Sequence, residues 1–158
     1  MQLESDTIRL LSKTYILSRQ QVTDCNPTPN NCISGLPEYA LVYIRNAGGV
    51  EQESDYPYST VTYFTGVNGT CKFNPSKAVV TVQDYYNVGG YMTNEQSIAA
   101  YVQSVGPVLL LIFPVYLQMY DGGIMTVCPS LYVDHIVQAV GVLPNSQGGY
   151  WFVDPNNK

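Results

Sequence analysis

The arrangement of apolar residues divides the chain into a helical first part and a strand-rich second part. In the first part apolar residues recur at helical spacing, as at positions 3, 8, 10 and 11 of the segment 3–11. In the second part they form short runs rich in valine, leucine and isoleucine, which are typical of buried strands. The pattern predicts an α+β fold in a single domain, residues 1–158, with a mostly helical part over 1–74 and a mostly β part over 75–158.

Three more helices are predicted from their start signals. These signals are a capping box from Ser18 to Gln21, the sequence 36–38 with a proline in its middle, and the sequence 94–96 with an asparagine at its head. The first of these helices is expected to end near Cys25, and the second at the glycine pair 48–49, which permits a left-handed turn.

Strands are predicted where short apolar runs are bounded by glycine, proline or asparagine. They cover the segment from 79 to 82, residues 108–113, residues 133–141 and residues 150–153, with a hairpin turn over 144–149. Residues 60–74 carry polar and small residues and are predicted to form a loop.

The composition narrows the classes of partner. Only 12% of the residues are charged and the formal net charge is -5, so nucleic-acid binding, which favours a basic face, is not expected. No apolar run approaches the roughly 18 residues of a membrane span. The 14 tyrosines suit extensive protein contacts, because tyrosine is enriched at interfaces. We therefore expect a protein partner or self-association.

The four cysteines, Cys25, Cys32, Cys71 and Cys128, are too dispersed for a zinc site, and the single histidine does not stand at a ligand spacing. No metal and no cofactor are expected. Asn68 begins an Asn-Gly-Thr triplet, which is an acceptor sequence for N-glycosylation. Together with the cysteines it favours an oxidising location, either extracellular, lysosomal or elsewhere in the secretory pathway.

His135 is the only histidine in the chain, and it stands at the entrance of an apolar run. Histidine in general titrates near neutral pH and is the usual general base. A base requires a nucleophile, an orienting partner and oxyanion donors. The alternative is that His135 is a half-buried side chain whose hydrogen bonds are satisfied without any catalytic role.

An ordered set of short motifs resembles the papain and cathepsin L family of cysteine proteases. The set covers nearly the whole chain, and its members are LSRQQVTDC at 17–25, NCISGLP at 31–37, GGV at 48–50, DYPY at 55–58, GTC at 69–71, GPV at 106–108, YDGGI at 120–124, VDH at 133–135, AVG at 139–141 and YWFV at 150–153.

The resemblance implies a helical left lobe and a β-rich right lobe that face each other across a cleft. In that family a cysteine at the start of the central helix attacks the peptide carbonyl, a histidine removes its proton, and an asparagine orients the ring. A glutamine side chain and a backbone N–H stabilise the oxyanion. The resemblance assigns His135 to the position of the base.

Several family features have no counterpart among these residues. The family's CGSCWAF segment and its oxyanion glutamine precede the helix that corresponds to 3–11, so they fall before Met1. Pro155 stands at the position of the orienting asparagine, with Asn156 one residue further on. We therefore expect an incomplete papain-like fold, truncated at both ends.

The resemblance also assigns the cysteines. It pairs Cys25 with Cys71, and it matches Cys32 and Cys128 to family cysteines whose partners lie in the missing segments. Both are thus expected to be unpaired within this chain. The alternatives are that a longer precursor or another chain supplies the partners, or that both are buried thiols.

Five residues match the family's substrate cleft. Gly35 matches a glycine whose backbone pairs with an extended substrate, and the apolar pocket beside it would contain Leu36, Pro37, Leu111 and Ile136. Ile136 is bulkier than the usual glycine or alanine, so the pocket is expected to be shallow. The alternative for all five is ordinary core packing.

Two functions follow from these observations. The first is a papain-like cysteine peptidase homologue that is catalytically inactive as this chain and serves in binding or in a structural assembly. The alternative is a fragment or subunit of an active papain-like endopeptidase whose nucleophile lies outside this chain. The absence of a matched nucleophile favours the first, since the catalytic residues act as a unit.

Overall fold

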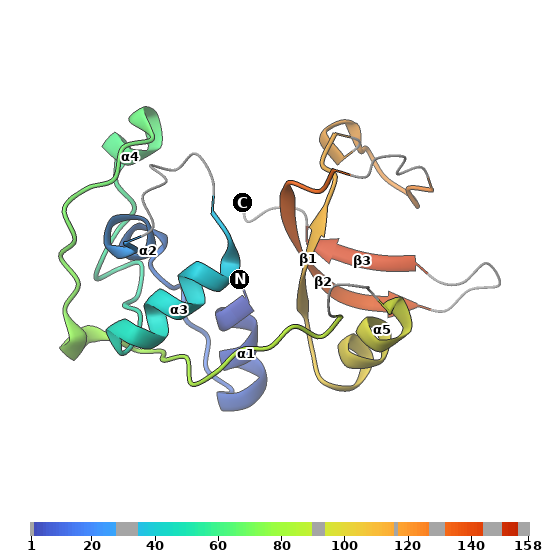
Figure 1. Cartoon of the computed structure of the whole chain (residues 1–158), viewed down its shortest axis with the longest axis horizontal. Coiled ribbons are helices and arrows are strands. Elements are labelled where there is room, and N and C mark those ends of the chain that lie inside the picture. The colour runs from blue at the N-terminus through green and yellow to red at the C-terminus, as the bar shows by residue number, and fades with distance from the viewer. Residues whose placement is uncertain are drawn as a thin grey trace. The chain divides into compact units, whose positions relative to one another are not determined.

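A computed structural model describes residues 2–27, 35–89, 94–115, 117–126, 132–143 and 150–154. These residues form five α-helices and a three-stranded antiparallel sheet (Figure 1), which confirms the predicted α+β class. The helices are α1 Gln2–Leu11, α2 Arg19–Cys25, α3 Pro37–Ala47, α4 Thr60–Thr65 and α5 Glu95–Ser104; the strands are β1 Val108–Ile112, β2 His135–Leu143 and β3 Tyr150–Asp154; 3₁₀ turns cover Pro75–Lys77 and Leu117–Met119.

The chain divides into two compact units. One consists of Met1–Leu11 and Asn87–Lys158, and we call it the sheet unit because it contains all three strands. The other is Ser12–Tyr86, which we call the disulfide unit because it contains the bonded pair Cys25 and Cys71. The division at residues 74 and 75 that we expected from the sequence stays a prediction.

The disulfide unit is built from α2, α3 and α4 around a core that is partly polar. α3 begins at Pro37, whose missing N–H is no loss in the first turn, and it ends at Gly48, which has a φ of 88°. The most buried large side chains include polar ones as well as valine. The apolar members of this core are Leu17, Ile44, Val50, Tyr56, Val80 and Val82, and its polar members are Gln20, Gln21 and Glu51.

The predicted capping box at the start of α2 is only half formed. Ser18 caps the helix, because its Oγ accepts the Gln21 N–H at 3.0 Å. The side chain of Gln21 does not return to Ser18, whose own N–H donates instead to Glu51 O at 2.9 Å. The side chain of Gln21 bonds to a distant segment instead, because its Nε2 donates to Gly49 O at 3.1 Å. Tertiary partners therefore replace the second bond of the box.

Two sequence-based expectations in the disulfide unit were wrong. The predicted loop over 60–74 contains α4, which Ser59 caps by accepting the Thr62 N–H and which Gly66 ends with a φ of 66°. Its β-branched and aromatic residues have weak helix propensity, and the two end signals outweigh it. The predicted strand from 79 to 82 is a single isolated bridge between Val50 and Val80. The Val50 N–H donates to Val80 O, and Val50 O accepts the Val79 N–H, both at 2.9 Å.

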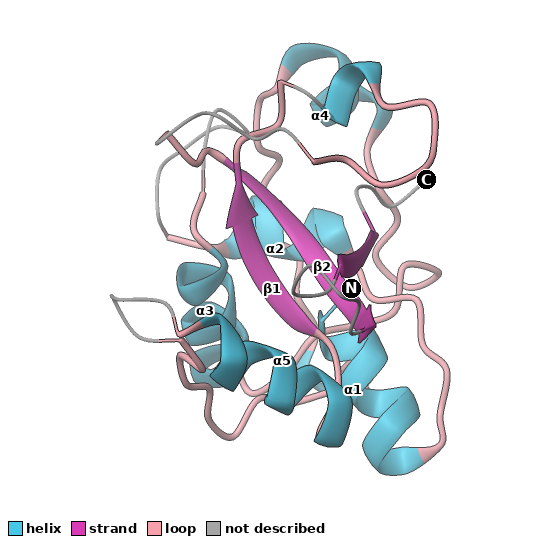
Figure 2. Ribbon diagram, turned by 90° about the vertical axis from the view of Figure 1, so that its right-hand side faces the viewer, coloured by secondary structure: helices cyan, strands magenta, loops and turns pink. Residues whose placement is uncertain are grey.

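The sheet unit has the strand order β1-β2-β3 with both pairs antiparallel. Figure 2 shows β1 and β2 running side by side in opposite directions. α5 is capped by Asn94, whose side chain accepts the N–H groups of Gln96 and Ser97. It packs Ile98 and Val102 against Val108 and Ala139 of the sheet. This packing buries one face of the strand that begins with the histidine.

Other sequence-based expectations are settled only in part. α1, α5 and the strands 108–113, 133–141 and 150–153 are confirmed to within two residues at each end. The hairpin turn expected over 144–149 lies outside the described residues. No helix in the described ranges is both long and apolar enough to cross a membrane.

Candidate active site

His135 is the first residue of β2 and lies half-buried opposite Ile112, the last residue of β1. The backbone before it is fixed, because the Asp134 N–H donates to Ile112 O at 3.2 Å. Side chains alternate along a strand, so His135 projects from the same face as Val137 and Ala139. The paired ladder thus fixes the backbone of His135 at the start of β2.

The sheet unit also brings together two of the predicted cleft residues. Leu111 and Ile136 are register partners in the β1–β2 ladder, on the face opposite to that of His135. Leu111 is 51% exposed and Ile136 is half-buried. The pair therefore presents apolar surface on the sheet face that does not carry His135.

The other three predicted cleft residues lie together in the disulfide unit. Gly35 and Leu36 lead into α3, and Pro37 is its first residue. Leu36 has an extended backbone, with φ -110° and ψ 139°, and its side chain is 46% exposed. A Cβ added at Gly35 would meet nothing within 4 Å. Glycine at this position is therefore not demanded by packing within the described residues.

The predicted disulfide is present. Cys25, the last residue of α2, is bonded to Cys71 across 46 residues. These are the only cysteines in the described ranges, so no described cysteine is a free thiol. The predictions for Cys32, Cys128, Pro155 and Asn156 concern positions outside the described residues.

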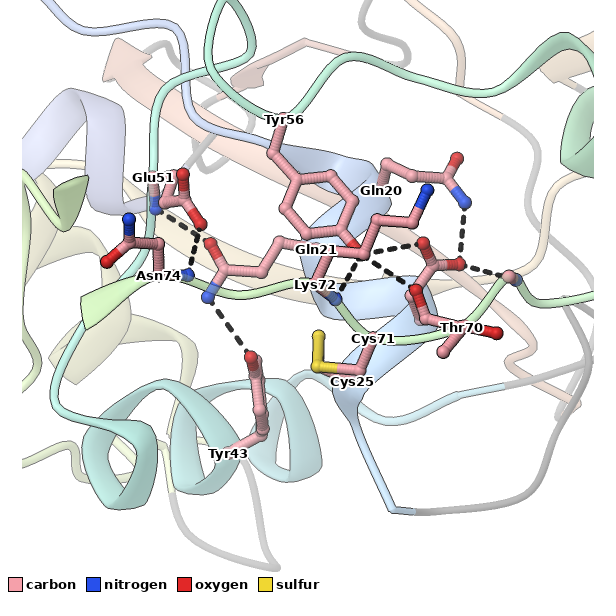
Figure 3. The surroundings of a disulfide bond; sticks show 12 residues. Gln20, Gln21, Cys25, Tyr43, Glu51, Tyr56, Thr70, Cys71, Lys72 and Asn74 are labelled. Carbon is pink, nitrogen blue, oxygen red and sulfur yellow. Dashed lines mark hydrogen bonds between the residues drawn. A yellow bond between two sulfur atoms is a disulfide. The ribbon is translucent and has the colours of Figure 1, made fainter. Parts of the chain in front are cut away.

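Asp24, next to the disulfide, collects hydrogen bonds from three segments. Its Oδ1 accepts from Gln20 Nε2 at 2.7 Å and from the Gly69 N–H at 2.6 Å, and its Oδ2 accepts from the Tyr56 hydroxyl at 2.9 Å. Figure 3 shows Gln20 and Tyr56 converging beside Cys25 and Cys71. The carboxylate and the disulfide therefore fasten the same loop to α2.

Burial changes the acidity of two tyrosines in this unit. It raises the pKa of Tyr56 to about 12, and the hydrogen bond to the Asp24 carboxylate adds to this effect while the Lys72 N–H opposes it. Burial also raises the pKa of Tyr43, with the hydrogen bond from Gln21 opposing it and the charge of Glu51 adding to it. Both phenols are thus held protonated well above neutral pH.

Asn68 lies half-buried in the coil between α4 and Cys71. Its Oδ1 is the only buried side-chain nitrogen or oxygen in the described residues that lacks a hydrogen-bond partner. The following Gly69 N–H is held by Asp24 at 2.6 Å. The triplet thus stands in an ordered loop outside any helix or strand.

Two polar features of the structure were not predicted from the sequence. One is the set of bonds to Asp24, and the other is Gln138, which is 3% exposed in the middle of β2. A glutamine inside an otherwise apolar strand is a usable signal, because a buried amide needs hydrogen-bond partners. Within the described part of the chain, no three acidic, histidine or cysteine side chains gather in a group that could hold a metal ion.

The chain is similar to known cysteine proteases. Residues 2–156 match the family model described as papain family cysteine protease. Cysteine proteinase 1 of Zea mays is 38% identical over 141 residues, which cover 82% of this chain and 35% of that protein. A cathepsin L-like peptidase of Aedes aegypti is 32% identical over 158 residues, which cover 96% of this chain and 44% of that protein.

A solved structure shares the fold. The Amb a 11 cysteine protease of ragweed pollen, in its proform, superposes with a TM-score of 0.81 at 30% identity, over 96% of this chain and 40% of that one. The chain therefore spans less than half the length of these relatives. Because the family model matches almost every residue, the chain belongs to the papain family of cysteine proteases.

Proposed function

We propose that these 158 residues carry the base and part of the substrate cleft of a papain-like peptidase, and that by themselves they bind extended peptide without cleaving it. The observation that supports this most directly is the state of the cysteines. Within the described residues both cysteines, Cys25 and Cys71, are bonded to each other, so neither is available as a nucleophile.

The proposed roles follow the two groups of site residues. Gly35 and Leu36 offer extended backbone and an exposed apolar side chain for a strand-like substrate. Leu111 and Ile136 offer the apolar wall on the sheet unit. His135 would accept the proton of a thiol.

The test uses an epoxysuccinyl inhibitor and measurement of intact mass. The 158-residue chain should gain no adduct, and a fluorogenic peptide should not be hydrolysed above the rate in buffer. A fluorescently labelled peptide with a central leucine should nevertheless bind. A single adduct that disappears in His135→Ala would overturn the inactive assignment and make hydrolysis the function of this chain.

A second candidate is favoured by the coverage of the relatives. The chain accounts for 35% and 44% of the two curated relatives, so it fits a part of an active peptidase whose nucleophile is supplied from outside these residues. Joining a CGSCWAF segment and its family linker before α1 should then produce one adduct that depends on His135. An extended chain that folds and still gains no adduct would contradict this second candidate and favour the catalytically inactive homologue.

Association with a protein partner or with a second copy is part of the proposal. It is supported by exposed apolar side chains on α1, where Ile8, Leu10 and Leu11 are 52%, 64% and 59% exposed. Light scattering should show a mass above that of the monomer, and a monodisperse monomer would contradict it. We propose no nucleic-acid partner, because the charge is -5.

The disulfide and the Asn-Gly-Thr triplet support a location in the secretory pathway, a lysosome or outside the cell. We propose that Asn68 carries an N-linked glycan there. Expression in a eukaryotic secretion system should give a mass that falls after treatment with an N-glycosidase. A secreted chain with the mass of the unmodified sequence would contradict the glycan.

A further inference from the structure

α1 is fastened to β2, the strand that begins with His135, through one buried amide. Gln138 Nε2 donates to Gln2 Oε1 at 3.2 Å, and Ser5 Oγ donates to Gln138 Oε1 at 3.3 Å. Gln138 is only 3% exposed. Both ends of this amide are therefore bonded to the first turn of α1. All three residues belong to the sheet unit.

A second contact holds the same helix to the turn before β1. Gln2 Nε2 donates to Pro107 O at 2.9 Å, so one side chain contacts both the turn and β2. Further along α1, the Cδ atom of Arg9 lies 2.9 Å from where a Cβ of Gly106 would stand. Gly106 has a φ of 154°, which also disfavours a side chain there. The first and last turns of α1 therefore both lie against the turn at residues 106–107.

The choice of glutamine at position 138 needs a physical reason. Its neighbours in the strand and its register partner in β1, Leu109, are apolar, whereas its register partner in β3 is Asp154. Leucine would therefore match the strand and β1 without requiring any bond. A buried amide is costly when it is unpaired and contributes modestly when it is paired. Its particular effect is to favour one register over others, because a shifted helix leaves it unsatisfied.

We propose that Gln138 is a positioning residue, which through Gln2 and Ser5 sets the place of the first turn of α1 relative to the strand of His135. The inference rests on the second form of the proposed function, in which a thiol is supplied from residues joined ahead of α1. The first turn then determines where that thiol stands, and an error of about 1 Å there costs up to roughly a hundredfold in rate.

The first experiment concerns the fastening alone and uses the 158-residue chain. In Gln138→Leu, amide hydrogen exchange over residues 2–11 should become roughly two- to tenfold faster, which is the loss of one or two modest hydrogen bonds. Exchange in α5 and β1 should stay as in the wild type. Gln103→Leu, the same change at an exposed position of α5, is the matched control and should alter neither segment.

Unchanged exchange over 2–11 in Gln138→Leu would overturn the proposal. If that variant does not fold, Ser5→Ala decides the matter, because it removes only the 3.3 Å bond and alanine is the best helix former. It should increase exchange in α1 by a smaller factor, and wild-type exchange in Ser5→Ala would overturn the proposal as well.

The second experiment separates positioning from mere stability and uses the chain extended by the cysteine-bearing segment. Below the melting temperatures of both proteins, Gln138→Leu should lower the rate of alkylation by the epoxysuccinyl inhibitor by at least about tenfold. An equal rate, or a fall that only follows the melting temperature, would overturn the positioning role. Absence of any adduct in the unsubstituted extended chain would instead defeat the peptidase proposal, and the exchange result would stand by itself.

Discussion

The hydroxyl of Tyr56 donates to Asp24 Oδ2 at 2.9 Å, across 32 residues of chain. The same hydroxyl accepts the Lys72 N–H at 3.1 Å, next to the disulfide at Cys71. One phenol thus connects α2 to the loop that the disulfide closes. Because the donor must keep its proton to make this contact, the arrangement depends on pH.

Tyr56→Phe should change how stability responds to alkaline pH. The pKa of Tyr56 is raised from 10.0 to about 12 in the folded state, so the folded protein holds this proton more tightly than the unfolded one. The resulting stability is fully present below about pH 10 and is lost as the pH rises toward 12. Urea unfolding at pH 9 and pH 11.5 should show a smaller loss in Tyr56→Phe than in the wild type.

The control for this prediction is an exposed phenol. Tyr63 is 70% exposed, and Tyr63→Phe should leave the pH response unchanged. Equal alkaline losses in the wild type and in Tyr56→Phe would contradict the raised pKa. At pH 7 the variant should also be less stable by about 2 kcal/mol, because it lacks a hydrogen bond to a carboxylate.

Cys71→Ser should destabilise the disulfide unit more than Tyr56→Phe does. The bond closes 46 residues, and the chain-entropy model gives about 4 kcal/mol for a loop of this size. Thermal unfolding with and without a reductant is the measurement. Reduction should lower the melting temperature of the wild type but not of Cys71→Ser, and the double variant Cys25→Ser, Cys71→Ser should resemble the single one. A wild type that is indifferent to reduction would contradict the prediction.

The sequence predicted best those features that local chemistry determines. Asn94 at the head of α5 and Gly48 at the end of α3 are local signals that tertiary structure did not override. α4 was not predicted because residues such as Val61 and Phe64 have weak helix propensity, although Ser59 and Gly66 mark both of its ends.

Two features that the sequence did not predict correctly depend on partners far away in the chain. Gln21 was expected to bond back to Ser18 and instead reaches Gly49, 28 residues further on. Gln138 was read as part of an apolar run, although its partners Gln2 and Ser5 are more than 130 residues away. No local pattern identifies such partners, whereas the isolated polar residue itself is visible in the sequence.

Ser18→Ala should cost about 1 to 2 kcal/mol of stability, at the upper end for a helix cap. The Ser18 Oγ both accepts the Gln21 N–H at 3.0 Å and donates to Tyr56 O at 2.6 Å, so its removal leaves two buried backbone groups without a partner. Chemical denaturation measures the loss. Ser54→Ala, at an exposed turn, is the control and should change stability by less than about 0.5 kcal/mol. Equal stabilities of the two variants would show that the cap contributes little.

Gly35→Ala separates a requirement for binding from a requirement for folding. The position is exposed, and an added Cβ meets nothing within 4 Å, so the melting temperature should stay within about 1 °C of the wild type. If an extended peptide pairs with the backbone here, the same methyl group stands in its path, and affinity for the labelled peptide should fall by about tenfold or more.

Gly48→Ala is the reciprocal control, because its φ of 88° makes alanine strained while the residue is not among those proposed to contact peptide. It should lower the melting temperature and leave peptide affinity unchanged. Equal peptide affinity in Gly35→Ala and the wild type would remove Gly35 from the proposed cleft.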